Sequence, residues 1–177
     1  MSIPACIRDN PSISSHQALV CLMDKADDLH DLVVDTDMSL REFMAGALSY
    51  MPGWMRFLYR IRKYLVLLLG TRQDGIPDAE TIRPEELSFT PGEKGAFFTI
   101  TGAQEDAYWI GEASDRMIVG HLAVVREELA TGSHRFHFLS GASYRHWTGR
   151  IYYNLILPIH HLVIRLMARD ALKARLR

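Results

Sequence analysis

Histidine is the residue type in this sequence that is best suited to acid–base chemistry near neutral pH. The chain has eight histidines, and an unperturbed imidazole titrates close to physiological pH. His121 lies in the segment 117–125, where the residues on its own face are otherwise apolar. A partly desolvated imidazole there can act as a general base or orient a ligand. A histidine that only hydrogen-bonds to a neighbour and completes the sheet is the simpler interpretation.

Several other side chains combine an apolar ring with a polar group and can orient a molecule bound in a cavity. The candidate ligand-binding residues are Tyr108, Trp109, His121, His137, Tyr153 and His160. Glu112, Tyr144 and His146 are secondary candidates of the same kind. The sequence assigns none of them a catalytic role.

Metal-binding and cofactor motifs are missing from the sequence. His134 and His137 are three residues apart, so on a strand their side chains leave opposite faces. His160 and His161 are adjacent, so on a helix they point about 100° apart. No paired cysteines, His-Glu-x-x-His, glycine-rich phosphate loop or nucleophile elbow occurs. We therefore predict no metal and no cofactor.

Composition restricts the classes of partner and the compartment. Lys+Arg number 20 and Asp+Glu 21, which gives a formal net charge of −1. Nucleic-acid-binding domains are usually strongly basic, so no nucleic-acid partner is expected. The chain has two cysteines, no basic start followed by an apolar run, and no run of about 20 apolar residues. These features favour a cytoplasmic protein with reduced thiols.

One predicted helix combines a basic face with an apolar end. Arg56, Arg60 and Lys63 project from one face of a predicted helix that ends in the apolar run 65–69. Basic groups and buried apolar area act together when a helix rests on an anionic membrane. We therefore include peripheral membrane contact through these residues as a hypothesis, with an ordinary solvated face as the simpler alternative.

Two helices are predicted in the first half of the chain, after a first strand. The segment 29–36 is rich in β-branched and apolar residues, as expected of a strand. Ser39 and Glu42 form the pattern of a capping box, which predicts that a helix begins there. Pro52 ends this helix, and a second amphipathic helix follows it.

The second half changes to an extended pattern and then returns to a helical one. Turn-like pairs, such as Gly102 with Ala103, separate short segments and imply an antiparallel meander. The predicted strands are 86–90, 96–101, 104–112, 116–127 and 133–143. The segment 148–176 is predicted as a helix that buries a broad apolar stripe, including Leu155, Ile159 and Leu162, against the sheet.

This order of elements predicts an α+β fold in one domain. It consists of an N-terminal strand, two helices, a curved antiparallel sheet of about five to six further strands and a long C-terminal helix. Residues 1–27 are expected to form a partly ordered N-terminal extension, and residues 28–177 the domain itself. A straight helix does not fill a curved sheet, so a cavity is expected between the two.

Two sets of residues connect the chain with a known family. The first set, in the second helix, is Trp54, Leu58, Arg62, Leu65 and Gly70. The second set is the stretch Gly149-Arg150-Ile151-Tyr152-Tyr153, followed by Pro158, His160 and His161. In their order and spacing, from about Asp28 to Arg169, the chain resembles a bacterial family of unknown function (DUF2867-like). The element order is similar to the helix-grip fold of the START (SRPBCC, Bet v 1-like) superfamily, which includes pollen-allergen-like ligand carriers and aromatase/cyclases.

The resemblance implies a fold and a general type of function, but no transferable catalytic residues. The leading hypothesis is a binding module, without assigned enzyme activity, that holds a small apolar or amphipathic molecule between the curved sheet and the C-terminal helix. The first alternative is a cyclase- or hydrolase-like enzyme that uses a cavity histidine and a tyrosine. The second is a protein-interaction or membrane-surface module with no ligand.

Overall fold

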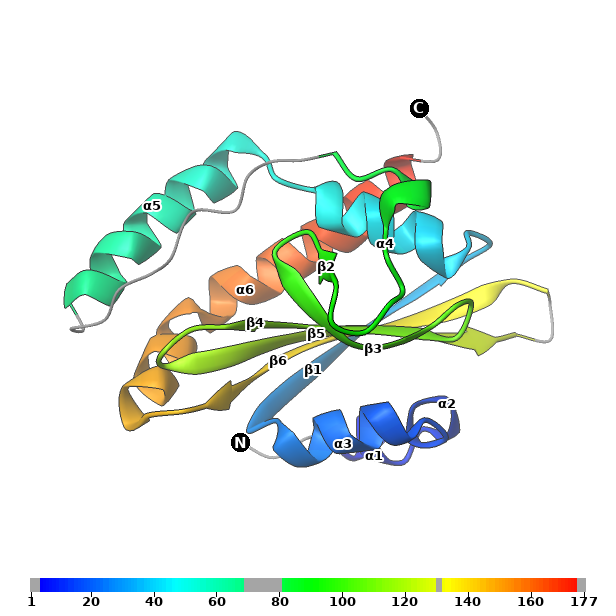
Figure 1. The fold of residues 1–177 in the computed structure, drawn as a ribbon, viewed down its shortest axis with the longest axis horizontal. Helices are drawn as coiled ribbons and strands as arrows, with labels where there is room; N and C mark the ends of the chain where they lie inside the picture. Colours follow the sequence, from blue (N-terminus) through cyan, green and yellow to red (C-terminus); the bar gives the residue numbers. More distant parts are fainter. Residues whose placement is uncertain (1–3, 69–80, 130–131, 175–177) are drawn as a thin grey trace.

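A six-stranded antiparallel sheet forms the centre of the computed structural model, which describes residues 4–68, 81–129 and 132–174 (Figure 1). The strands lie in the order β1-β6-β5-β4-β3-β2. Their bounds are β1 Asp28–Thr36, β2 Lys94–Gly95, β3 Phe98–Gln104, β4 Tyr108–Ser114, β5 Ile118–Glu128 and β6 His134–Tyr144. The first strand and the last strand therefore lie side by side.

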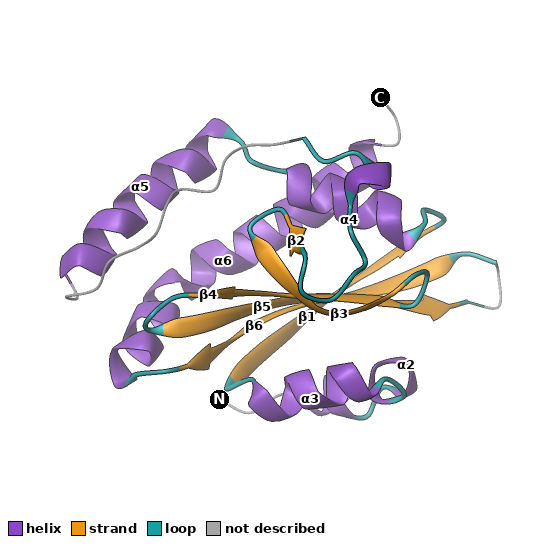
Figure 2. Cartoon of the chain, in the orientation of Figure 1, coloured by secondary structure: helices purple, strands orange, loops and turns teal. Residues whose placement is uncertain are grey.

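Helices cover both faces of this sheet (Figure 2). The N-terminal helices lie on one face, and α4 and α6 lie on the other. The helices are α1 Ala5–Arg8, α2 Pro11–Ser14, α3 Gln17–Lys25, α4 Leu40–Ser49, α5 Gly53–Leu68 and α6 Trp147–Ala174. Figure 1 shows α5 extending from the end of α4 away from the sheet. The α+β class, the open curved sheet and the long C-terminal helix agree with the prediction.

The larger hydrophobic core lies between the sheet and the two helices α4 and α6. Phe43 of α4 contacts Phe136 and Phe138 of β6, with ring centroids 4.9 and 5.8 Å apart. The helix α6 contributes its C-terminal half to this core through Ile164, Met167, Ala168 and Ala171. Burial of such apolar area is the main stabilising contribution to the fold.

A second core lies on the opposite face, under the N-terminal helices. Ile7, Ile13 and Leu19 are fully buried there and pack with residues of β5 and β6, including Val125 and Leu139. Because both faces are covered, β5 is buried at five consecutive positions, from His121 to Val125. The segment that we predicted as an N-terminal extension thus contributes one of the two helical layers.

Two details of the strand prediction are wrong. The segment 86–90 is not a strand, because Pro84–Glu86 forms a turn of 3-10 helix and the residues that follow it form a loop. Gly102 does not lie in a turn but within β3, where the register with β4 shifts at a bulge. The turn comes later, at Asp106, which adopts a left-handed conformation with φ of 59°. Aspartate tolerates this conformation better than most residues do.

The predicted burial of apolar residues along the C-terminal helix is also wrong for three of them. Leu155, Ile159 and Leu162 are 62%, 43% and 50% exposed. Apolar residues occur around most of the helix, and only one face can contact the sheet. Of the helices in the described segments, only α6 is long and apolar enough to cross a membrane, a property that the core helices of many soluble proteins share.

The predicted capping box is confirmed at the start of α4. The backbone N–H of Glu42 donates to Ser39 Oγ at 3.3 Å, and the Ser39 N–H donates to a Glu42 carboxylate oxygen at 2.9 Å. We expect Ser39→Ala to lower the free energy of unfolding by about 1 kcal/mol, measured by urea denaturation. Ser39→Thr keeps the hydroxyl and should recover most of this loss. Equal losses in both variants would contradict a role for the cap.

Candidate functional site

A partly open pocket of about 170 Å³ lies between α6 and the strands β1 and β6. We call it the α6 pocket. Its lining residues are His30, Asp31, Leu32, Phe138, Ser140, His161, Ile164 and Arg165. Leu32, Phe138 and Ile164 form apolar walls, and His30, Ser140, His161 and Arg165 add hydrogen-bonding and charged groups. The pocket lies where the sequence led us to expect a cavity, although it is small.

Strand alternation and helical spacing explain why these residues meet. Successive side chains of a strand point to opposite faces, so Asp28, His30 and Leu32 share the face toward α6. In the β1–β6 register, His30 is opposite Ser140 and Leu32 is opposite Phe138. On α6, His161 and Arg165 are four residues apart and therefore neighbours on the helix surface.

A chain of polar groups leads from this pocket into the interior. His30 Nε2 lies 3.4 Å from a carboxylate oxygen of Asp28, which is only 2% exposed. The rings of His30 and His161 meet edge to face, with centroids 4.2 Å apart. Asp28 Oδ2, the Tyr153 hydroxyl and His161 Nε2 are buried without a hydrogen-bond partner among the described residues. Such groups are rare in native proteins and require an explanation.

Burial shifts the pKa of two groups in this polar cluster, His161 and Tyr153. It lowers the pKa of His161, and the nearby His30 and Arg165 lower it further. It also raises the pKa of Tyr153, and the negative charge of Asp28 adds to that effect. At neutral pH, His161 is therefore an uncharged imidazole and Tyr153 keeps its hydroxyl proton. These two side chains therefore offer uncharged hydrogen-bonding groups at neutral pH.

Arg165 is the positively charged residue of the α6 pocket. Its side chain is exposed, and in the described segments it forms no ion pair with a carboxylate. Guanidinium groups bind carboxylates and phosphates through paired, charge-assisted hydrogen bonds. Arg165 can therefore receive the anionic group of a molecule whose apolar part enters the pocket.

The sequence-predicted site residues do not converge on one place. Trp109 is fully buried in the larger core, and its indole N–H donates to the Ser88 carbonyl oxygen at 3.2 Å. The ring of Tyr108 packs against His16 on the opposite face, at 4.7 Å. None of the six candidates lines the α6 pocket. Tyr153 and His160 lie on α6 with their rings 6.0 Å apart, and the His160 ring is 6.5 Å from that of His161, which does line it.

His121 lies in a polar cluster under α3, on the sheet face that points away from α6. Its Nε2 is 2.6 Å from Ser143 Oγ, and its Nδ1 is 3.4 Å from a Glu112 carboxylate oxygen. This arrangement has the residue types of a Ser-His-acid triad. However, the Ser143 hydroxyl donates to the Lys25 carbonyl oxygen at 2.7 Å, so its one hydrogen is not available to His121. The cluster thus ties the end of α3 to the sheet.

Burial dominates the titration of His121. Its side chain is almost completely covered, and this burial lowers its pKa, while the charge of Glu112 acts in the opposite direction. A second pocket, of about 150 Å³, lies beside this cluster between α3 and the strands β3 and β4. Its lining residues are Ala18, Cys21, Leu22, Lys25, Thr101, Ile110 and Glu112.

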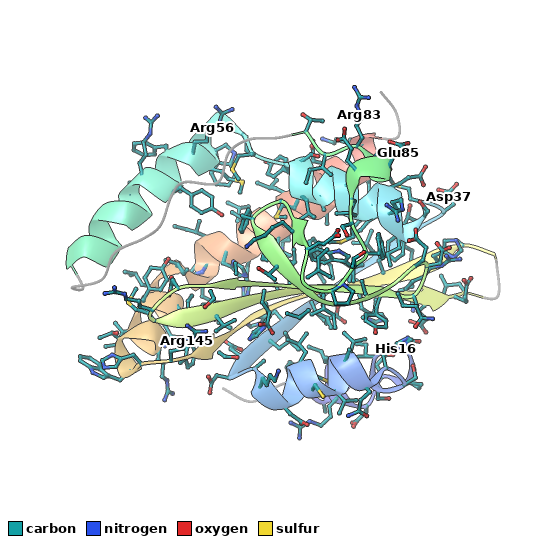
Figure 3. The ribbon with its side chains drawn as sticks, viewed as in Figure 1. His16, Asp37, Arg56, Arg83, Glu85 and Arg145 are labelled. Carbon is teal, nitrogen blue, oxygen red and sulfur yellow. The ribbon has the colours of Figure 1, made fainter. Side chains whose placement is uncertain are left out.

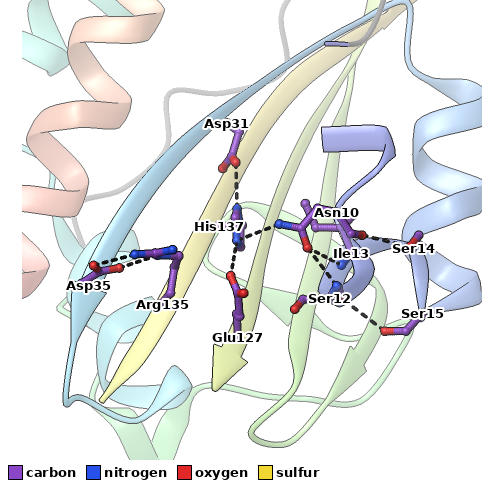
Figure 4. Close-up of polar contacts among 10 residues, drawn as sticks. All are labelled: Asn10, Ser12, Ile13, Ser14, Ser15, Asp31, Asp35, Glu127, Arg135 and His137. Atoms are coloured by element: carbon purple, nitrogen blue, oxygen red, sulfur yellow. Dashed lines mark hydrogen bonds and ion pairs between the residues drawn. The ribbon is translucent and has the colours of Figure 1, made fainter. Parts of the chain in front are cut away.

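His137 is held by two carboxylates (Figure 4). Its Nδ1 donates to Asp31 at 2.8 Å and its Nε2 donates to Glu127 at 3.0 Å. The hydrogen bond to the Asp31 carboxylate is the main cause that raises the pKa of His137, and the hydrogen bond to Glu127 adds to it against the effect of burial. The side-chain amide of Asn10, which caps α2, lies 3.2 Å away. Because Nε2 of the charged imidazole already donates to Glu127, the Asn10 amide is a packing contact, and the hydrogen bonds of His137 join β6 to β1 and β5.

Sequence reasoning missed most of the α6 pocket. His30, Ser140 and Arg165 line the pocket but were not among the candidates. The alternation of His30 and Leu32 within the predicted strand 29–36 was a readable signal for part of it. Within the described segments, no group of three or more His, Cys, Asp or Glu side chains is arranged to hold a metal ion.

The chain matches a known protein family over most of its length. The sequence model of a family described as "Protein of unknown function (DUF2867)" matches residues 26–167. No curated protein matches the sequence. The matched segment begins just before β1 and ends within α6, so it contains every residue that lines the α6 pocket. It does not include α1, α2 and α3.

Proposed function

Since the chain belongs to the DUF2867 family, whose description names no activity, we propose a function from its own geometry: it binds a small amphipathic molecule in the α6 pocket. The observation that carries this proposal is the combination of apolar walls with buried polar groups that lack partners. A ligand can supply the hydrogen bond that Nε2 of His161, which lines the pocket, does not receive from the described chain.

The size of the pocket restricts the ligand. A dry engineered cavity of about 150 Å³ takes up a single benzene molecule, and the α6 pocket has about 170 Å³. It thus suits one ring, a short branched chain, or the end of a longer molecule. Leu32, Phe138 and Ile164 would contribute most of the affinity through apolar contact.

The polar groups indicate which chemical class of ligand fits best. Arg165 offers a positive charge at the exposed side of the pocket, and Ser140 and the neutral His161 offer hydrogen bonds. We therefore propose an apolar molecule that carries one anionic group. The helix-grip arrangement, with α6 packed across a curved sheet whose first and last strands are neighbours, supports placement in the START superfamily.

A first experiment asks what the protein already holds. Native mass spectrometry of the full chain purified from cells should show a stoichiometric small molecule, which extraction would then identify. A molecule with a ring or a short apolar chain and one anionic group would support the proposal. A protein that is empty would weaken the case for a tightly bound ligand, and the probe experiment would then decide.

Benzoate is a suitable probe, with toluene as its uncharged counterpart. In NMR titrations of the full chain, benzoate should shift the resonances of Leu32, Phe138 and Ile164 and bind more tightly than toluene. Arg165→Ala should weaken benzoate binding about tenfold or more, because it removes a charge-assisted contact. Arg169→Ala removes the same charge one turn further along α6 and should leave binding unchanged.

Two results would contradict the proposed function. One is the absence of benzoate- or toluene-dependent shifts at the residues of the α6 pocket. The other is equal weakening by Arg165→Ala and Arg169→Ala, which would show that only general positive charge attracts the probe.

A further inference from the structure

A stripe of large apolar side chains runs along the exposed face of α6. Trp147, Ile151 and Leu155 are 68%, 56% and 62% exposed, and Ile159 and Leu162 continue the line. We call these five residues the α6 stripe. Their spacing of three to four residues places them on one side of the helix. Contiguous exposed apolar patches on soluble domains mark sites of interaction with proteins or membranes.

Positive charge surrounds this stripe. Arg150 lies beside its first turns, and Arg165 and Arg169 follow it on the same side of the helix; all three are exposed. The sequence from Trp147 to Arg169 contains no Asp or Glu. The surface thus combines apolar side chains with a positive charge that no acidic residue of this segment neutralises.

The arm formed by α5 repeats this combination. Trp54, Phe57 and Ile61 are 37%, 60% and 47% exposed and lie on one side of the helix. Arg56 and Arg60 are exposed beside them, and Figure 3 shows Arg56 pointing away from the rest of the molecule. The sequence 53–68 contains no acidic residue. The predicted contact residue Lys63 and the apolar run 65–69 lie outside the residues whose side chains are described.

We infer that the α6 stripe, supported by α5, docks on the surface of an anionic membrane. A bilayer surface offers an apolar layer for the stripe and anionic headgroups for the arginines, and these two contributions act together. Tryptophans such as Trp147 prefer the boundary between the two layers. Because the opposite face of α6 packs against the sheet and α4, the helix lies along the membrane and does not cross it.

Charge favours a membrane over a second copy of this chain. If two copies met through the α6 stripe in antiparallel orientation, the Arg165 end of one helix would lie over the Trp147 end of the other, which carries Arg150 and no acidic residue. In parallel orientation, Arg165 would face Arg165. Like charges at an interface oppose association, whereas anionic lipids neutralise them. The inference does not depend on the proposed function, since none of the five stripe residues lines the α6 pocket.

Vesicle flotation with the full chain tests this inference. We expect binding to vesicles of phosphatidylcholine mixed with phosphatidylglycerol, much weaker binding to phosphatidylcholine alone, and a decrease with added salt. Ile151→Glu and Leu155→Glu should each weaken binding at least about tenfold, because each removes apolar contact and adds repulsion. Val33→Glu changes an exposed apolar residue of β1, 49% exposed, and should have no effect.

Circular dichroism and benzoate binding show whether a variant that has lost vesicle binding is still folded. Because Ile151 and Leu155 are exposed, both variants should retain the wild-type spectrum and the wild-type affinity for benzoate. No flotation of the wild-type protein with anionic vesicles would overturn the inference. A wild-type dimer in sedimentation analysis that Leu155→Glu dissociates, without vesicle binding, would assign the α6 stripe to self-association and would overturn it as well.

Discussion

Replacing His137 by alanine is expected to lower the free energy of unfolding by about 2–4 kcal/mol at pH 6, and by less at pH 9. The side chains of His137 and Asp31 are only 6% and 13% exposed, and Glu127 is 31% exposed. Removal of the imidazole leaves two carboxylates without their shared cation, and it removes the contact with the α2 cap. Urea denaturation of both proteins at the two pH values measures the effect.

The sign of the pH dependence follows from the raised pKa of His137. Below the ordinary imidazole pKa of about 6.5, the group is charged in the folded and in the unfolded chain, and its contribution to stability is fully present. As the pH rises through the raised folded pKa, this contribution is lost. The difference between wild type and His137→Ala should therefore decrease with increasing pH.

His134 provides the matched control on the same strand. Its Nδ1 lies 3.1 Å from a carboxylate oxygen of Glu128, whose side chain is 67% exposed. Exposed ion pairs contribute little, so His134→Ala should cost less than about 1 kcal/mol. An effect of His137→Ala that is as small as that of His134→Ala, or that grows toward pH 9, would contradict the assigned role of His137.

Gly141→Ala should lower the free energy of unfolding by about 3 kcal/mol. Gly141 lies in β6 opposite Leu29 of β1. A Cβ atom there would overlap the Asp28 carbonyl oxygen and lie 2.9 Å from Leu29 Cα. These are backbone atoms, so the strand pair itself has to move apart. Because Asp28 belongs to the polar cluster beside the α6 pocket, the variant should also weaken benzoate binding.

Gly120→Ala, on the neighbouring strand β5, is the control variant. It distinguishes the steric effect at Gly141 from the general effect of replacing a glycine in a strand. The nearest atom to a Cβ at Gly120 is the Ala113 carbonyl oxygen at 3.5 Å, an ordinary contact. Gly120→Ala should leave the stability unchanged or raise it by up to about 1 kcal/mol. Equal losses in the two variants, measured by urea denaturation, would show that close approach is not the cause.

The type of most elements was readable from the sequence because their signals are local. The capping box of Ser39 and Glu42 depends on residues three apart, and the strand pattern of 116–127 depends on alternation within one segment. The strand prediction failed where two local signals in the same segment favour different structures. The segment 86–90 has side chains suited to a strand, but the helical turn at Pro84 and the loop after it take its place.

The sequence by itself determined the α+β class, the order of the main helices and strands, and the presence of a long apolar C-terminal helix. Only the tertiary structure decided that β1 pairs with β6, which brings His30 together with His161 and Arg165 from the other end of the chain. It also decided that His121 lies under α3 and that Leu155 of α6 remains exposed. The physical reason is that periodicity shows which side chains share a face, whereas the element that covers the face is set by contacts between distant segments.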